Sequence, residues 1–100
     1  MKRIKQSTLD EIRQIPILDV ARDLGLTLTR HGSYYFTNCF LHEDSTPSLW
    51  IKPSYNFWKC EGCGAKGDQI ALVRNYLNIG FMDAVEWLAG QYAIEIRYEQ

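Results

Sequence analysis

The sequence has no excess of charge of one sign and no long hydrophobic run, and each absence excludes a class of protein. Its 11 Lys and Arg residues against 12 Asp and Glu residues leave a formal net charge of -1. That balance excludes a polybasic nucleic-acid tail and a cationic membrane binder. No apolar run approaches the roughly 18 residues of a transmembrane helix, and no signal-peptide core follows Met1. We therefore expect a cytoplasmic protein without a membrane partner.

Cysteine is also scarce. The 3 cysteines are an odd number, which fits a metal site or buried free thiols better than a closed disulfide framework. The 100 residues are 46% hydrophobic and 23% charged, as is typical of a folded domain. A chain this short buries only somewhat more than ~60% of its unfolded surface, so an additional cross-link such as a bound metal would contribute much of its stability. We expect residues 1–100 to form a single domain, too short for a template-driven polymerase.

The two ends of the chain are predicted to be helical and the middle to be a sheet. Thr8 and Glu11 have the spacing of a capping box, Pro16 suits the first turn of a second helix, and Gly25 suits a left-handed C-terminal cap. Alternating or aromatic stretches predict strands at residues 26–29, 34–37, 48–52 and 57–60.

The C-terminal part continues with helices. Asp68 is a good N-cap for one helix, a second begins near Phe81, and residues 93–98 are predicted to form a short terminal strand. The predicted fold class is α+β: a small antiparallel sheet with flanking N- and C-terminal helices.

Two pairs of residues have the spacing of metal ligands. Cys39-x2-His42 and Cys60-x2-Cys63 are separated by 17 residues, and two such turns brought together by a hairpin supply the four corners of a tetrahedron. Thiolates with one imidazole favour zinc over calcium or magnesium. Four protein ligands leave no open position for water, so we expect one structural Zn²⁺. The alternatives are buried thiols with an ordinary loop histidine, or a thiol redox pair.

The residues around these pairs resemble a known family. Residues 39–49, CFLHEDSTPSL, are similar to the C-P-F-H-x-E-x-T-P-S-F signature of the zinc-binding domain of bacterial and phage DNA primases. Residues 57–70, FWKCEGCGAKGDQI, look like that family's F-Y-x-C-F-G-C-G-x-x-G-D-x-I stretch. Residues 81–89, FMDAVEWLA, resemble its F-x-E-A-V-E-x-L-A. The likeness covers about residues 14–96, and both ligand pairs match.

The resemblance implies a zinc ribbon, with its core at about residues 34–68, that binds a single-stranded DNA template and helps to position primer initiation in DNA replication. The catalytic domain that would make the primer is absent, so we expect no enzyme activity from this chain by itself. The implied partners are single-stranded DNA and a primase catalytic domain or replicative helicase. The alternative is a protein-interaction module that docks onto a replication partner without contacting DNA.

One face of the central hairpin is the predicted DNA surface. A four-residue loop would pair Trp50 with Lys59 and Lys52 with Phe57, which puts these four side chains on one face, opposite Leu49, Ile51, Trp58 and Cys60. Aromatic rings interleaved with lysines suit single-stranded nucleic acid. Alternatively, helices cover the rings as core and the lysine tips reach solvent.

Other charged and polar residues are assigned separately. Lys66 and Arg74 are further candidate phosphate contacts, and His31 is predicted to be a solvated turn residue. With about 2–4 phosphate contacts, binding should have a shallow salt slope of about -1.4 to -2.8.

Overall fold

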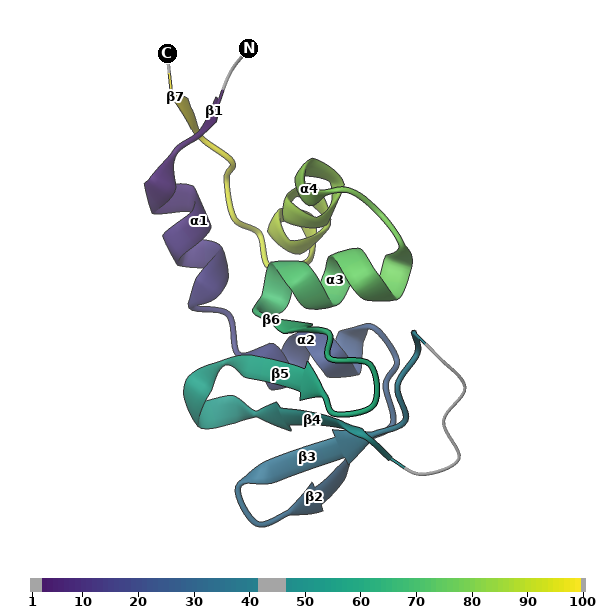
Figure 1. The fold of residues 1–100 in the computed structure, drawn as a ribbon. Helices are drawn as coiled ribbons and strands as arrows, with labels where there is room; N and C mark the ends of the chain where they lie inside the picture. The colour runs from purple at the N-terminus through teal and green to yellow at the C-terminus, as the bar shows by residue number, and fades with distance from the viewer. Residues whose placement is uncertain (1–2, 42–46, 100) are drawn as a thin grey trace.

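The computed structural model describes residues 3–41 and 47–99. The N-terminal part comprises strand β1 (Arg3–Ile4) and helices α1 (Gln6–Arg13) and α2 (Ile17–Asp23). Strand β7 (Tyr98–Glu99) pairs antiparallel with β1. The first and last strands therefore lie side by side, far from the main sheet (Figure 1).

The main sheet has five antiparallel strands in the order β2-β3-β4-β5-β6. They are β2 (Thr29–His31), β3 (Tyr34–Thr37), β4 (Leu49–Lys52), β5 (Phe57–Cys60) and β6 (Lys66–Gly67). A 3-10 turn at Pro53–Tyr55 joins β4 to β5, and Asn56 closes it in the left-handed region with φ 47°. The register pairs Trp50 with Lys59 and Lys52 with Phe57, which confirms the predicted hairpin.

Helices α3 (Gln69–Leu77) and α4 (Phe81–Gln91) follow the sheet. The carboxylate of Asp68 accepts a hydrogen bond of 3.0 Å from the backbone N–H of Ala71, which confirms Asp68 as the N-cap. All four helices lie on the same side of the sheet (Figure 1). Along the chain, two helices precede the five-stranded sheet and two follow it. The predicted α+β fold with flanking N- and C-terminal helices is therefore confirmed.

The local signals of the N-terminal part are confirmed in part. Pro16 is the N-cap of α2 and Gly25 has φ +92° just after it. The capping box is wrong, because α1 begins after Lys5 and Thr8 is buried inside it. The Thr8 hydroxyl accepts a hydrogen bond from the backbone N–H of Arg97, so a contact with a distant segment has replaced the local cap.

Two strand predictions differ from the structure in their limits. The strand expected at residues 26–29 is β2, which begins only at Thr29. The apolar–polar alternation at Leu26 and Leu28 arises because both side chains pack against the core. Within the part of the chain that the structure describes, these residues do not pair with another strand. The strand expected at residues 93–98 is reduced to β7, because only its end reaches β1.

The core forms between the helices and the inner face of the sheet. Leu49, Ile51 and Trp58 are fully buried there, together with residues of α2, α3 and α4. The indole N–H of Trp58 donates to the carbonyl oxygen of Asp68 at 3.0 Å, which ties β5 to the start of α3. The alternation predicted for β4 and β5 therefore selects the correct inward face.

A polar joint connects the first two helices to the rest of the molecule. The buried amide of Gln69 donates to the carbonyl oxygens of Arg13 and Ile15, at 3.0 and 2.6 Å. The side-chain oxygen of Asn56 accepts from the backbone N–H of Ile17 at 3.0 Å. The turn between α1 and α2 is thus held by the hairpin tip and by α3. No helix within the described ranges has both the length and the apolar character needed to span a membrane.

Candidate metal centre and nucleic-acid interface

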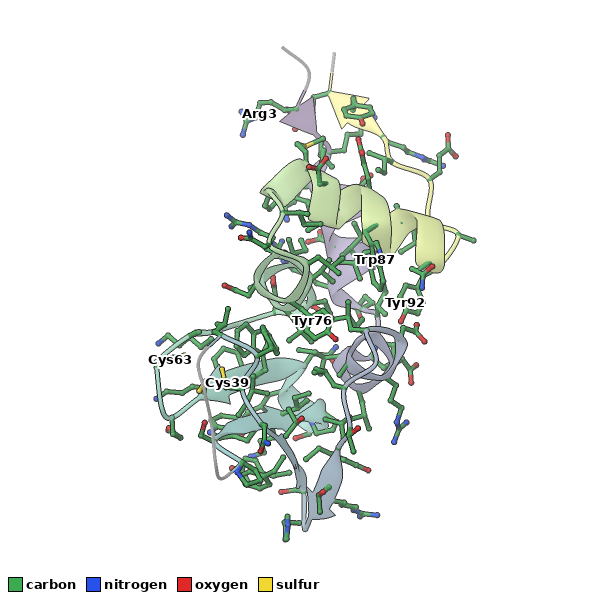
Figure 2. The ribbon with its side chains drawn as sticks, turned by 90° about the vertical axis from the view of Figure 1, so that its right-hand side faces the viewer. Arg3, Cys39, Cys63, Tyr76, Trp87 and Tyr92 are labelled. Atoms are coloured by element: carbon green, nitrogen blue, oxygen red, sulfur yellow. The ribbon has the colours of Figure 1, made fainter. Side chains whose placement is uncertain are left out.

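Three cysteines from two separate segments meet beside the sheet. Cys39 lies two residues after β3, Cys60 ends β5, and Cys63 lies in the turn that follows. Their sulfur atoms all lie within 4.8 Å of one another, and those of Cys39 and Cys63 are 3.9 Å apart. Figure 2 shows the side chains of Cys39 and Cys63 converging on one point.

This spacing fits a metal ion better than a covalent link. Zinc–sulfur bonds of about 2.3 Å in a tetrahedron place two sulfurs about 3.8 Å apart, close to the 3.9 Å between Cys39 and Cys63. A disulfide would require about 2.05 Å, and none of the three cysteines is in a disulfide. The donor set of three soft sulfurs therefore fits zinc.

The turn at the second pair is shaped by the backbone. The N–H of Gly64 donates to the carbonyl oxygen of Cys60, and the N–H of Cys60 donates to that of Ala65, both at 2.8 Å. Gly64 has φ +81°, a conformation that glycine adopts at little cost. This tight turn allows Cys60 and Cys63 to point to the same place.

Contacts of the two residues after Cys39 hold this first cysteine in place. The backbone N–H of Leu41 lies 3.4 Å from the sulfur of Cys39 and donates to it. The ring of Phe40 packs at 6.3 Å from the ring of Trp58 and edge-on at 5.0 Å from that of Tyr76. Phe40 thus anchors the chain next to Cys39 to the core.

Without a cation, the surroundings of Cys39 favour its neutral thiol. Burial raises the pKa of the Cys39 thiol to about 12, and the neighbouring thiols add to the rise while the N–H of Leu41 opposes it. Three thiolates at this spacing would repel one another. A bound cation reverses this balance by stabilising the deprotonated sulfurs. His42, the expected fourth ligand, lies outside the described residues.

The side chains predicted to face DNA lie on the side of the sheet away from the helices. Trp50, Lys52, Phe57 and Lys59 share this face and are half-buried. The ring neighbours of Trp50 are Tyr34 at 5.4 Å and Phe57 at 6.0 Å, both from the same sheet. Since all four helices lie on the other side (Figure 1), the alternative in which helices cover these rings is wrong.

Strands β2 and β3 extend this surface beyond the predicted hairpin. Phe36 pairs opposite Trp50, and His31 pairs opposite Tyr34. The rings form a continuous row, with centroids 5.5 Å apart for His31 and Phe36 and 6.3 Å for Phe36 and Tyr34. We call the outer face the set His31, Tyr34, Phe36, Trp50, Phe57, Lys52, Lys59 and Lys66. His31 is exposed, as predicted, but it is the last residue of β2 and directly precedes the turn in which it was expected.

The cations of the outer face differ in their surroundings. The ammonium of Lys52 lies 5.3 Å from the ring centroid of Tyr34 and 3.9 Å from that of Tyr55. The ammonium of Lys59 lies 3.5 Å from a carboxylate oxygen of Glu61, and Lys66 pairs across the sheet from Lys59. Arg74 is on α3, beside a hollow lined by Leu41 and other residues, so the structure does not bring it onto the outer face.

Comparisons with known proteins match almost the whole chain. The family model described as CHC2 zinc finger matches residues 4–100. The DNA primase of Aquifex aeolicus is 41% identical over 95 residues, which are 94% of this chain and 19% of that protein. The DNA primase of Salmonella typhimurium is 34% identical over 90 residues, 90% of this chain and 15% of that protein.

A solved structure agrees with these matches. The crystal structure of the Aquifex aeolicus primase, comprising its zinc binding and RNA polymerase domains, superposes with a TM-score of 0.85 at 40% identity. The match covers 93% of this chain and 23% of that one. This chain thus spans less than a fifth of the length of the curated relatives named above. By sequence and by structure, the chain belongs to the CHC2 zinc-finger family and has the fold of the zinc-binding domain of DNA primase.

Proposed function

We propose that this chain binds a single-stranded DNA template through its outer face and helps to position primer initiation. One structural zinc ion, held by Cys39, His42, Cys60 and Cys63, keeps that face in shape. Residues 1–100 act as one unit with the ribbon core at residues 34–68. The chain contributes no catalysis by itself and works in the cytoplasm with a primase catalytic domain or a replicative helicase.

The observation that carries this proposal is the row of rings bordered by lysines. Each ring from His31 to Phe57 lies 5.4–6.3 Å from the next, centroid to centroid, on the face of the sheet opposite the described helices (Figure 1). Stacking of a base on an aromatic side chain is worth about 1–3 kcal/mol and tolerates any base. Lysine ammonium groups beside the rings take phosphates.

The zinc ion has a structural role in this proposal. Its four ligands are all supplied by the protein, so no position is open for a reacting water. Binding of zinc to small zinc-finger peptides contributes about 10–16 kcal/mol, as much as the whole net stability of a typical domain. Metal binding therefore joins the segment after β3 to the end of β5 and fixes the outer face between them.

A second function is supported by a different surface. Leu77, Phe81 and Met82, at the turn between α3 and α4, are 38–41% exposed. We call these three residues the α3–α4 patch. An apolar patch of this kind suits docking onto a protein, so the second candidate is a protein-interaction module that attaches to a replication partner without contacting DNA.

Matched aromatic truncations on the two surfaces separate the functions. Binding of a fluorescent single-stranded oligonucleotide is measured by anisotropy for the wild type, Trp50→Ala and Phe81→Ala. DNA binding by the outer face predicts that Trp50→Ala weakens affinity at least about fivefold, the lower limit for losing one stacked base, while Phe81→Ala leaves it unchanged. Absence of DNA binding at low salt, or equal affinities for wild type and Trp50→Ala at an unchanged melting temperature, would favour the docking function.

A further inference from the structure

A groove lies at the β2 edge of the outer face. It has a volume of about 440 Å³, and the described residues that line it are Thr29, His31, Phe36 and Pro47. Thr29 and Phe36 are paired directly opposite each other on β2 and β3. The groove is therefore part of the sheet surface and continues the row of rings.

The walls of the groove combine apolar rings with polar groups. The rings of His31 and Phe36 stand nearly perpendicular, at an interplanar angle of 77°, and Pro47 adds a third apolar wall. Neither the Thr29 hydroxyl nor the His31 imidazole makes a hydrogen bond to any residue in the described ranges. Both side chains are exposed, so their polar atoms are available to a ligand.

This combination matches one chemical class. An unstacked nucleobase has two apolar faces that pack against rings and a polar edge that carries donors and acceptors. A Thr hydroxyl both donates and accepts, and a neutral imidazole does the same through its two nitrogens. A phosphate would instead call for a cation, and the lysines of the outer face lie on β4, β5 and β6 and do not line the groove.

We propose that this groove accepts one nucleobase of the single-stranded DNA, with Thr29 and His31 forming hydrogen bonds to its edge. The inference rests on the proposed function, because single-stranded DNA bound along the outer face would bring the base to the groove. Stacking on Tyr34, Trp50 and Phe57 accepts any base. The groove would therefore be the part of the surface that makes binding depend on base identity.

The test compares affinities for homopolymeric single-stranded oligonucleotides of dA, dC and dT. Thr29→Val keeps the side-chain shape and removes the hydroxyl, His31→Ala removes the imidazole, and Ser33→Ala is a control in the same hairpin outside the groove. We expect the wild type to prefer one homopolymer. Thr29→Val and His31→Ala should each reduce that preference about 2- to 10-fold, the range for one net hydrogen bond, and Ser33→Ala should not.

The outcomes distinguish this inference from the proposed function. If Trp50→Ala weakens binding of every homopolymer while both groove variants keep the wild-type preference, the base-binding groove is refuted and the function stands. Equal wild-type affinity for all three homopolymers, or a uniform loss in the groove variants, also refutes it. If neither Trp50→Ala nor the groove variants change binding, the proposed function fails as well. Melting temperatures of all variants show that the fold is unchanged.

Discussion

The ion pair between Lys59 and Glu61 gives a quantitative prediction for DNA binding. The two groups are 3.5 Å apart, with Lys59 38% and Glu61 55% exposed, so the pair is open to solvent and weak. If Lys52, Lys59 and Lys66 each contact one phosphate, single-strand binding should have a salt slope of about -2.1. Replacing one of three cations, as in Lys59→Gln, should reduce the slope to about -1.4.

These slopes are far enough apart to measure. Raising salt from 50 to 200 mM should weaken wild-type binding about 18-fold and Lys59→Gln binding about 7-fold. Glu61→Gln should act in the opposite direction, because Glu61 competes with a phosphate for Lys59 and repels the strand. We expect it to bind more tightly at low salt with a slope no shallower than that of the wild type.

The assay is fluorescence anisotropy of a labelled single strand over a series of salt concentrations. Arg97 and Glu95 form an equally open pair at 3.7 Å, 65% and 80% exposed, in the segment that leads to β7. Arg97→Gln and Glu95→Gln therefore change net charge as Lys59→Gln and Glu61→Gln do, but away from the outer face (Figure 1). If Arg97→Gln lowers the slope as much as Lys59→Gln does, binding depends on net charge and the assignment to the outer face is wrong.

Three further predictions concern stability. Cys63→Ser should abolish zinc binding and cooperative unfolding, because lost zinc binding costs about 10–16 kcal/mol. Cys63 is exposed, so the substitution itself removes little packing. An unchanged calorimetric melting curve after chelation would contradict this prediction. Gly67→Ala should destabilise the protein by about 1–3 kcal/mol, because the added Cβ would lie 2.5 Å from the Cβ of Ala71 and Gly67 has φ +154°. The control is Gly90→Ala, whose added Cβ would have no described atom within 4 Å. This control should be neutral or slightly stabilising in urea unfolding. Gln69→Leu should cost about 1–3 kcal/mol, because it removes the amide that donates to the carbonyl oxygen of Ile15 at 2.6 Å, whereas the carbonyl oxygen of Arg13 keeps the amide of Asn56 at 3.3 Å. An unchanged urea midpoint would show that water replaces the amide of Gln69.

The hairpin of β4 and β5 could be predicted from sequence because its local signals agree. The loop between Lys52 and Phe57 has a length that sets the register, and alternation then assigns each side chain to a face. The same reasoning found the two cysteines at the end of this hairpin. Their approach to Cys39 followed only from the expectation of a shared metal.

The rest of the outer face could not be predicted in the same way. β3 ends at Thr37 and β4 begins at Leu49, and a separation of this length in the sequence does not set which residue of β3 pairs with Trp50. The pattern Tyr34-Tyr35-Phe36 predicts a strand, but it does not predict which face of the sheet the rings of Tyr34 and Phe36 occupy. The pairing of β1 with β7 and the contact of Thr8 with Arg97 join opposite ends of the chain, and no local pattern reports such contacts.

The central claim is that the outer face binds single-stranded DNA, and a residue-by-residue NMR titration of the zinc-loaded chain tests it most directly. Addition of an oligonucleotide should shift the backbone amide signals of β2 to β5, with the largest changes near Tyr34, Trp50 and Lys59. Signals of α4 and of the α3–α4 patch should stay in place. Shifts confined to the α3–α4 patch, or no shifts at low salt, would contradict the account.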